Sequence, residues 1–353
     1  MIGREGRETR RNAPRTAVSE SYVRSLPKAE LHLHLEGSVG PDRLLALARK
    51  YGTEYASLSA AALTEKLYRY GSLHEFLGAF KVVCQHVRGK EDYGDILEDL
   101  AESLLRQGVF YAEIIYSPSI PWIWGRDGRE ILRHLLKTGA RFEEKGLVIR
   151  WVLDCVRQFG VEAAWRTARL AAEHRGRGVV ALGMGGDELS LPLTEYRDVF
   201  LWAKAHEIYI HVHAGEIGEP DQVWSALKDL GANRIGHGVQ AARDPRLIEY
   251  LREHAVGLDV CLTSNLRTRA WAPLSQHPFP LLYRRGVPVT LNTDDPGLFQ
   301  TSLTQEYLKA SRIFGLTARD LQRIALQAVR CSFLPHEAKM AHMQRIQDQV
   351  GLG

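Results

Sequence analysis

Short runs rich in β-branched and aromatic residues alternate with longer amphipathic stretches along this chain of 353 residues, and this alternation constrains the fold most. The pattern predicts β/α units around a parallel sheet. Eight strands are predicted: Glu30–Glu36, Val109–Ser117, Val148–Cys155, Val179–Gly183, Ile208–His213, Arg234–His237, Gly257–Leu262 and Val287–Asn292. Because eight parallel strands can close a barrel, the predicted fold class is α/β, a TIM-type (β/α)8 barrel.

The predicted helices lie between and after these strands. The connecting helices are Glu162–His174, Leu193–His206, Asp221–Leu230 and Pro245–Glu253, with Pro220 and Pro245 at the starts of the last two. The stretch Gly37–Gly108 is too long for one crossover helix, so we expect an inserted helical segment after strand 1 that includes Leu73–Val87. Extra C-terminal helices are predicted at Ser302–Phe314, Thr317–Cys331 and Glu337–Val350. With no linker or internal repeat, residues 22–353 are predicted to form one catalytic domain after a disordered tail at 1–21.

The composition excludes several functional classes. With 45% hydrophobic and 25% charged residues, the chain can bury enough apolar surface to fold. A net charge of +4 does not supply the concentrated basic surface that binds nucleic acid. The four cysteines are scattered, which is typical of reduced thiols. No stretch reaches the roughly 18 apolar residues of a membrane span, and no secretory signal is recognisable, so we expect a cytoplasmic protein without a membrane partner.

Polar and ionisable residues gather at the carboxyl ends of the predicted strands. The clusters are Glu30–Glu36 (ELHLHLE), Gly186–Glu188 (GDE), His211–Glu216 (HVHAGE), Gly236–Gly238 (GHG), Ser264–Asn265 and Asn292–Asp295 (NTDD). In a barrel these ends meet on one face, where active sites are built. As core residues, so many ionisable groups would be costly to bury unless they were paired or bound a metal.

Histidines two residues apart on a strand point to the same face, as His32 and His34 would. Such a pair is half of a tetrahedral metal site, and two hydrogen-bonded histidines would show the same spacing. His211 and His213 repeat the alternation, and His213 is favoured as a ligand because it lies nearer the strand end. Asp294 offers a carboxylate. Three imidazoles and one carboxylate predict one zinc-like divalent ion per chain, with a position open for water.

Missing motifs exclude other metal and nucleotide sites. Residues 179–188 contain no lysine that could bridge two ions, so we expect a mononuclear site. Neither the P-C-x-x-C element of compact zinc deaminases nor a G-x-x-x-x-G-K-[ST] phosphate loop is present in the sequence. The glycines near Gly183–Gly186 form no dinucleotide-binding motif.

Jointly, the motifs resemble the adenosine deaminase family of metal-dependent hydrolases. They occur in the family's order from residue 26 to about residue 310: Leu26–Gly37 (LPKAELHLHLEG), Gly186–Glu188, His213–Glu216 (HAGE), Gly236–Gly238 and Asn292–Pro296 (NTDDP). The resemblance implies that His32, His34, His213 and Asp294 bind zinc, with His34 also facing the substrate. It also implies hydrolytic deamination of a 6-aminopurine nucleoside, a small-molecule partner, to the 6-oxo product and ammonia.

Roles for further residues follow from the same resemblance. Glu216 is implied as the proton shuttle at purine N1, and His237 as acting on the zinc-bound water. Asp294 would also accept a hydrogen bond from that water. Asp295 would contact purine N7, and the Gly186 backbone would meet N3. A carboxylic acid suits the N1 position if desolvation raises its pKa. A turn position for His237 and a helix-capping position for Asp295 are the alternatives.

Three residues leave the substrate open. Glu36 stands where adenosine deaminases carry an aspartate that contacts the ribose 5′-hydroxyl, and adenine deaminases that share this glutamate usually lack the GDE element. Arg267 and Arg269 stand where relatives acting on adenosine have apolar residues or glycine. Because arginine suits carboxylate recognition, the sequence also resembles the branch that deaminates aminodeoxyfutalosine, a menaquinone precursor with a 5′-side benzoate. Solvent-facing arginines paired with acids are the alternative.

The sequence therefore predicts a zinc-dependent deaminase of adenosine-like nucleosides. Aminodeoxyfutalosine deaminase and adenine deaminase are the alternatives within the family. A non-catalytic metal-binding relative and another mononuclear amidohydrolase are alternatives from other classes. A binding module has no need for a proton shuttle such as Glu216, which favours an enzyme. The sequence makes no prediction of an oligomeric state.

Overall fold

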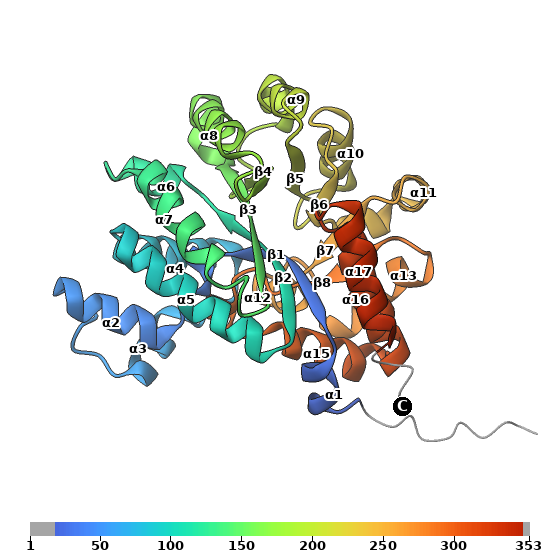
Figure 1. The fold of residues 1–353 in the computed structure, drawn as a ribbon, viewed down its shortest axis with the longest axis horizontal. Coiled ribbons are helices and arrows are strands. Elements are labelled where there is room, and N and C mark those ends of the chain that lie inside the picture. Colours follow the sequence, from blue (N-terminus) through green and yellow to red (C-terminus); the bar gives the residue numbers. More distant parts are fainter. Residues whose placement is uncertain (1–17, 349–353) are drawn as a thin grey trace, which may run out of the picture.

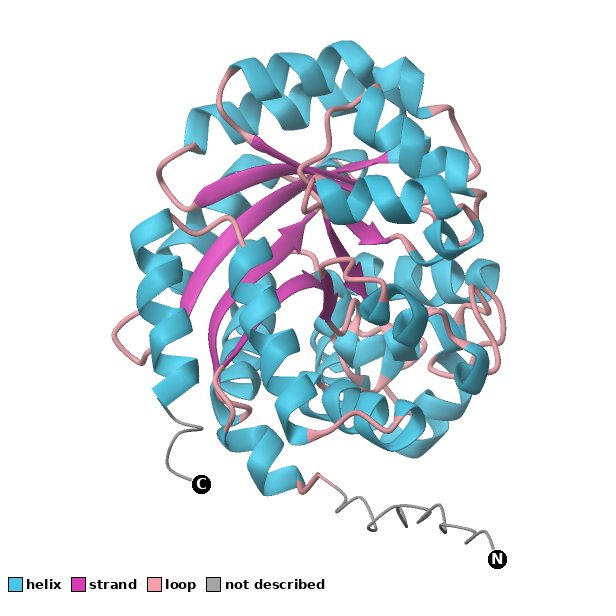
Figure 2. Cartoon of the chain, turned by 90° about the vertical axis from the view of Figure 1, so that its right-hand side faces the viewer, coloured by secondary structure: helices cyan, strands magenta, loops and turns pink. Residues whose placement is uncertain are grey.

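The computed structural model describes residues 18–348, which form eight parallel strands surrounded by helices (Figures 1 and 2). The strands are β1 (Lys28–His34), β2 (Val109–Tyr116), β3 (Val148–Val156), β4 (Val179–Gly185), β5 (Tyr209–Ala214), β6 (Arg234–His237), β7 (Gly257–Val260) and β8 (Val289–Leu291). Their spatial order follows the chain, and each strand pairs in parallel with the next. The predicted (β/α)8 barrel is thereby confirmed.

The barrel is nearly closed by contacts between β1 and the residues that follow β8. Leu33 forms a parallel bridge with Asp294. The backbone N–H of His34 donates to the Asp294 carbonyl at 2.7 Å, and the N–H of Asp294 donates to the His32 carbonyl at 3.1 Å. We call these contacts the β1–Asp294 seam. Three of the predicted metal-site residues therefore belong to the segment where the two ends of the sheet meet.

Helices cover the outside of the barrel and both chain ends. They are α1 (Glu20–Ser25), α2 (Pro41–Tyr51), α3 (Ala60–Leu67), α4 (Leu73–His86), α5 (Lys90–Arg106), α6 (Ser119–Ile123), α7 (Gly128–Ala140), α8 (Gly160–His174), α9 (Arg197–Ala205), α10 (Pro220–Lys228), α11 (Pro245–Glu253), α12 (Leu262–Arg267), α13 (Phe279–Arg284), α14 (Pro296–Phe299), α15 (Leu303–Phe314), α16 (Ala318–Cys331) and α17 (His336–Asp348). Short 3-10 helices are η1 (Glu36–Ser38), η2 (Arg157–Phe159), η3 (Leu193–Tyr196), η4 (Val239–Arg243) and η5 (Leu274–Gln276). Among residues 18–348, no helix is long and apolar enough to cross a membrane.

The predicted insertion after strand 1 is present as α2–α5, and the extra C-terminal helices as α15–α17. Figure 1 shows α2 and α3 at the periphery, farther from the strands than α4 and α5. The Ser72 hydroxyl accepts a hydrogen bond from the backbone N–H of Glu75 and so fixes the start of α4. Helix α16 packs against β1 and β8, on the outer side of the β1–Asp294 seam.

Several predicted boundaries differ from the observed ones. Strand β1 ends at His34 because Glu36 begins η1, and β7 ends at Val260 because Leu262 begins α12. At the N-terminus, the Ser19 hydroxyl accepts from the backbone N–H of Tyr22 and caps α1, so the last two residues of the predicted tail are helical. Residues 1–17 of that tail, and the last two residues of the predicted helix Glu337–Val350, lie outside the described residues.

The period-two pattern of β1 sends its leucines and histidines to opposite faces. Leu31 and Leu33 are fully buried in the hydrophobic layer outside the strands. On the inner side, the buried Arg234 guanidinium donates to Asp259 at 2.6 Å and to Glu113 at 2.5 Å. The same guanidinium donates to the carbonyl of Leu31 at 3.0 Å, which ties β6 to β1 across the interior. A charged network therefore supports the barrel near its histidines.

Candidate active site

Side chains from three strands and the β1–Asp294 seam converge at the carboxyl ends of the barrel strands. The Asp294 Oδ1 atom lies 3.2 Å from His32 Nε2 and 3.3 Å from His34 Nε2. The His213 ring centroid lies 4.4 Å from that of His32, and the His237 centroid lies 4.9 Å from it. The structure thus brings together the four predicted metal ligands and the predicted catalytic histidine.

Unusual backbone geometry places two of these residues. His237 (φ 60°) and Asp294 (φ 65°) lie in the left-handed region, which L-residues adopt at an energetic cost. Gly236 allows the close approach of the imidazoles, because a Cβ at this position would lie 2.8 Å from the His32 ring and 3.0 Å from the His213 ring. The structure holds this strain at the point where the polar side chains converge.

The donor set fits a divalent metal ion. The Nε2 atom of His213 is buried and has no hydrogen-bond partner among the described residues. Burial lowers the pKa of His32 to about 3 and the pKa of His213 well below its usual range, so both imidazoles are neutral, which is the form that binds metals. Burial works against ionisation of Asp294, yet hydrogen bonds from His32 and His34 hold its pKa well below the usual range. Nitrogen and carboxylate donors of this kind suit zinc.

The carboxyl groups of Asp294 and Asp295 lie close together in the site, and a positive charge would stabilise them. Burial alone would lower the pKa of His34, but the carboxylates of Asp295 and Asp294 raise it to about 10. Burial and the neighbouring Asp294 carboxylate in turn raise the pKa of Asp295 well above its usual range. A bound cation would relieve this crowding of acidic groups.

In a second buried group, His211 with Asp259, the carboxylate already has a counter-charge and hydrogen-bond donors in the protein. The two side chains also approach His32 closely enough to hold an ion. However, Asp259 accepts hydrogen bonds from Arg234 at 2.6 Å and from the Thr290 hydroxyl at 2.8 Å, and its Oδ2 lies 3.1 Å from His211 Nε2. The arginine supplies the positive charge there. His211 is fully buried beside this neutralised carboxylate, and its place farther from the strand end than His213 still predicts packing and not metal binding.

Glu216 lies in the loop after β5, with its carboxylate Oε2 atom 3.7 Å from His237 Nε2. The Thr268 hydroxyl donates to the other carboxylate oxygen at 3.3 Å. Burial raises the pKa of Glu216, which favours the protonated acid. The site therefore contains a carboxylic acid that can donate a proton into the cavity, and Thr268 is a contact that the sequence analysis did not assign.

A chain of hydrogen bonds reaches the Nδ1 atom of His237 and orients its ring. The backbone N–H of Phe279 donates to His277 Nδ1 at 3.1 Å, so the neutral His277 carries its proton on Nε2, 3.1 Å from the Asn265 carbonyl oxygen. Burial lowers the pKa of His277 to about 3, which keeps it neutral. The Asn265 amide nitrogen then faces His237 Nδ1 at 3.3 Å and donates to it. This contact occupies Nδ1 and leaves Nε2, the atom that faces Glu216, as the ring nitrogen available to a proton.

Glu188, the last residue of the GDE motif, was assigned no role by the sequence analysis, and the structure gives it a specific one. Its buried carboxylate accepts hydrogen bonds from four consecutive backbone N–H groups, those of residues 215–218. These residues form the loop that carries Glu216. Glu188 is an acidic residue of the GDE motif for which the family resemblance supplies no role, and this was the feature of the sequence that could have indicated it.

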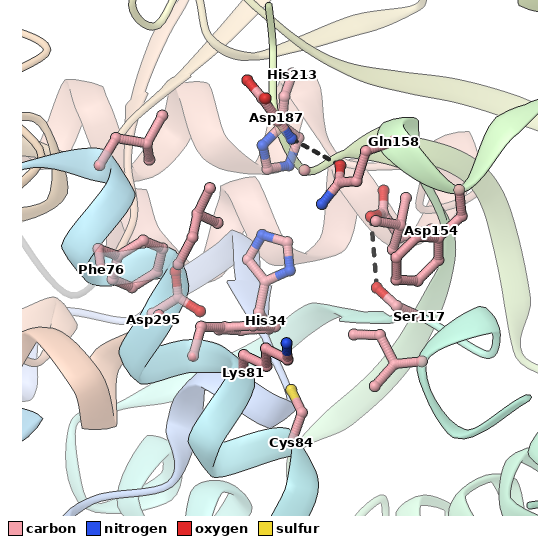
Figure 3. A pocket seen from close by; sticks show the side chains of 18 of the residues that line it. His34, Phe76, Lys81, Cys84, Ser117, Asp154, Gln158, Asp187, His213 and Asp295 are labelled. Carbon is pink, nitrogen blue, oxygen red and sulfur yellow. Dashed lines mark hydrogen bonds between the residues drawn. The ribbon is translucent and has the colours of Figure 1, made fainter. Parts of the chain in front are cut away.

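A cavity of about 640 Å³ opens in front of these residues (Figure 3). The convergent polar residues of the site all line it: His34, His213, Glu216, His237 and Asp295. Other walls of the cavity come from α4, from the β2–α6 segment and from the residues after β3 and β4. Gly186, whose φ of +93° favours glycine, also lines it, as the predicted backbone contact requires.

Asp154 is a further acid of this cavity that the sequence analysis did not single out. It comes from β3, is 2% exposed, and its Oδ1 atom has no hydrogen-bond partner among the described residues. Its other oxygen lies 3.5 Å from the Ser117 hydroxyl, which donates to it (Figure 3). Burial raises the pKa of Asp154 to about 7. A substrate group that donates a hydrogen bond would satisfy the free oxygen.

Three predicted substrate-binding residues lie outside the cavity wall formed by the described residues. Glu36 is completely buried in η1, where burial raises its pKa to about 7. The Arg267 guanidinium lies 5.8 Å from the centre of the Tyr70 ring, and the Arg269 guanidinium lies beside Gly71. The structure does not bring these arginines to the cavity, because their short segment turns toward the loop before α4. The cation that lines the cavity from α4 is Lys81.

Comparisons with known proteins agree with this geometry. The family model described as adenosine deaminase matches residues 27–349. The chain is 37% identical to an aminodeoxyfutalosine deaminase of Streptomyces avermitilis, with 90% of each chain covered. It is 32% identical to an adenosine deaminase of Klebsiella pneumoniae, covering 91% of this chain and 98% of the relative.

Solved structures share the fold. An adenine deaminase of Arthrobacter aurescens superposes with a TM-score of 0.87 at 26% identity, covering 92% of this chain and 99% of that chain. An amidohydrolase of Burkholderia ambifaria, solved with bound zinc, gives a TM-score of 0.85 at 21% identity, covering 98% of each chain. At that identity the second likeness supports the fold alone.

Proposed function

This chain belongs to the adenosine deaminase family and is a metal-dependent deaminase, and we propose that its substrate is a 6-aminopurine nucleoside. The reaction would replace the 6-amino group by oxygen and release ammonia. One observation carries this proposal. The cluster of His32 and Asp294 lies at the same cavity as Glu216, a buried acid whose pKa is raised.

His32, His34, His213 and Asp294 would hold one zinc ion, because their donor atoms converge and the Nε2 atom of His213 lacks another partner. A zinc ion bound there would supply a Lewis acid that makes water nucleophilic at neutral pH. The remaining chemistry belongs to side chains. Glu216 donates a proton to purine N1 as electron density moves onto that nitrogen, and it later passes a proton to the departing ammonia. His237, oriented by Asn265, holds the attacking water.

The size of the cavity favours a nucleoside over a free base. A volume of about 640 Å³ is typical of sites that enclose a whole drug-sized ligand. Asp295 and Gly186 both line the cavity, where they would contact the purine, as the family resemblance implies. The free carboxylate oxygen of Asp154 lines the same cavity and would accept a hydrogen bond from a sugar hydroxyl, which supports a nucleoside.

A second candidate, aminodeoxyfutalosine, is favoured by the α4 side of the cavity. Phe76, Phe80 and Trp124 line it there, and Lys81 lies on the same helix as the two phenylalanines. Within the described chain, Lys81 makes no hydrogen bond or ion pair. An aromatic group bearing a carboxylate would pack against such rings and pair with the lysine. The 37% identity to an aminodeoxyfutalosine deaminase supports the same choice.

The test measures ammonia release and the absorbance change of 6-amino to 6-oxo conversion on adenosine, deoxyadenosine, methylthioadenosine, adenine and aminodeoxyfutalosine. We expect turnover of nucleosides and little turnover of adenine. If aminodeoxyfutalosine is the substrate, Lys81→Met raises its KM while leaving the KM of adenosine unchanged. The matched control is Lys137→Met, an exposed lysine on α7 that does not line the cavity. Turnover of adenine alone, or of no 6-aminopurine, would refute the nucleoside proposal.

A further inference from the structure

The loop at residues 215–218 joins β5 to α10 and has no regular secondary structure of its own. Its backbone N–H groups therefore need partners outside a helix or a strand ladder. It carries Glu216, the acid that the proposed reaction requires. The position of that acid depends on whatever holds the loop in place.

Glu188 holds the donor side of this loop. Its side chain is 4% exposed, and its Oε2 atom accepts from the N–H groups of Glu216 at 3.1 Å, Ile217 at 2.9 Å and Gly218 at 3.0 Å. The Gly215 N–H donates to its Oε1 atom. Hydrogen bonds to a charged acceptor are stronger than neutral ones, and a single carboxylate here replaces water at four successive donors.

The acceptor side of the loop is held by Gln240 of η4. Its side-chain amide donates to the Glu216 carbonyl at 3.0 Å, and its backbone N–H donates to the Gly215 carbonyl at 2.9 Å. The backbone of Glu216 is thus fixed on both sides, while Thr268 contacts its carboxyl group. Glu188 is the one charged member of this arrangement.

We infer that Glu188 is a positioning residue that holds the Glu216 loop at the reacting centre, and that the GDE motif links the purine-contacting wall of β4 to the proton-donating loop of β5. Gly186 and Asp187 line the cavity, while Glu188, in the same segment, turns away to bind the loop. Glu188 itself does not line the cavity among the described residues. The inference rests on the proposed role of Glu216.

The experiment is a double-mutant cycle with Glu188→Gln and Glu216→Gln. A glutamine at 188 keeps one carbonyl oxygen but turns an NH2 group toward N–H donors, so the loop shifts. Because a displacement of about 1 Å can cost roughly 100-fold in rate, we expect kcat to fall by about that factor. The zinc content should stay the same, since Glu188 contacts none of the predicted ligands. In the Glu216→Gln background the same change should have little further effect on kcat.

Controls separate positioning from folding. Glu219→Gln makes the same substitution one residue beyond the loop, at an exposed side chain, and should leave kcat unchanged. Glu188→Asp keeps the charge and should restore part of the rate, and it replaces Glu188→Gln in the cycle if that variant does not fold. Amide hydrogen exchange, which is independent of activity, should quicken at residues 215–218 in Glu188→Gln and not in β5.

The outcomes are distinct. Unchanged exchange at residues 215–218, or an equal fall of kcat with and without Glu216, would overturn the positioning role. A parallel loss of zinc would overturn it as well, because the effect would then act on the metal site. If Glu216→Gln alone retains normal turnover, the proposed function fails, and the exchange measurement still decides whether Glu188 holds the loop.

Discussion

Replacing Glu216 by glutamine tests the proposed chemistry with the least disturbance of the site. The amide is nearly the same size as the carboxylic acid and can still accept the Thr268 hydroxyl, and the backbone of the loop keeps its bonds to Glu188. What is lost is the transferable proton. General acid catalysis contributes about 10²- to 10⁴-fold, which corresponds to roughly 2.7–5.4 kcal/mol of transition-state free energy.

For Glu216→Gln, the structure predicts a loss of rate in the upper part of this range of about 10²- to 10⁴-fold. Glu216 accepts a hydrogen bond from Thr268 and lies 3.7 Å from His237 in the cavity wall, and burial already raises its pKa toward the protonated form. Loss of this acid removes the one carboxylic acid for which the proposed reaction has a proton-donating role. We therefore expect kcat to fall by roughly 10³- to 10⁴-fold with a much smaller change in KM.

The assay combines steady-state kinetics on the best nucleoside of the panel with elemental analysis of the purified protein. Zinc should remain at one equivalent per chain, because Glu216 is not among the predicted ligands. Glu219→Gln, which lies three residues along the chain, is the control and should match the wild type. Turnover within tenfold of the wild type in a Glu216→Gln variant that retains its metal would refute the assignment of the proton donor.

Three further predictions concern the metal, the barrel interior and the substrate. Removal of the metal with a chelator should abolish turnover and lower the melting temperature, because an ion that binds only the folded chain stabilises it by about 2.7 kcal/mol at 100 times its Kd; added zinc should restore both. Arg234→Met should lower the free energy of unfolding in urea by about 3–5 kcal/mol, because Glu113 and Asp259 would be left buried without a counter-charge; a loss below about 1 kcal/mol would contradict this. Asp154→Asn should lower kcat/KM for adenosine by roughly tenfold or more and abolish the penalty for one of its 2′-, 3′- or 5′-deoxy analogues, whereas equal losses for all four would assign Asp154 a structural role.

The fold could be predicted because its signals are local and repeated. Each strand of the barrel is buried on both faces and reads as a β-rich run, and helices with a proline in the first turn, such as α10 and α11, begin where the sequence predicts. The predicted ends of the strands were less accurate where a strand is followed directly by a helix. Leu262 is apolar and follows β7 without a turn residue, so nothing in the local sequence indicates that it begins α12.

The clustering of candidate site residues was predictable where the residue type and spacing themselves indicate a site. The spacing of His32 and His34 and the acid at 294 point to one face of one barrel, and the structure brings them together. The sequence did not indicate residues whose contacts are to backbone groups or to a neighbouring β/α unit. Glu188 reaches residues 215–218 in the next β/α unit, and Asp154 lines the cavity from β3, where its backbone pairs with Gly183 of β4. Tertiary placement also decides that Lys81, and neither Arg267 nor Arg269, lines the cavity.

The β1–Asp294 seam joins the stability of the barrel to its chemistry. The same residue that closes the ring through its backbone, by exchanging hydrogen bonds with the backbone of His32 and His34, offers its carboxylate to their imidazoles at 3.2 and 3.3 Å. The Glu30 carboxylate accepts from the backbone N–H of Thr293 at 3.0 Å, and the Asn292 side chain accepts from that of Leu31 at 2.9 Å, so the two residues before Asp294 are tied to β1 as well. These bonds can fix the left-handed backbone at Asp294 before any ion binds, because β-sheet pairing elsewhere in the ring compensates its cost. An ion at this point would bridge side chains whose backbones already meet, so it would gain affinity from an arrangement that the fold has prepared.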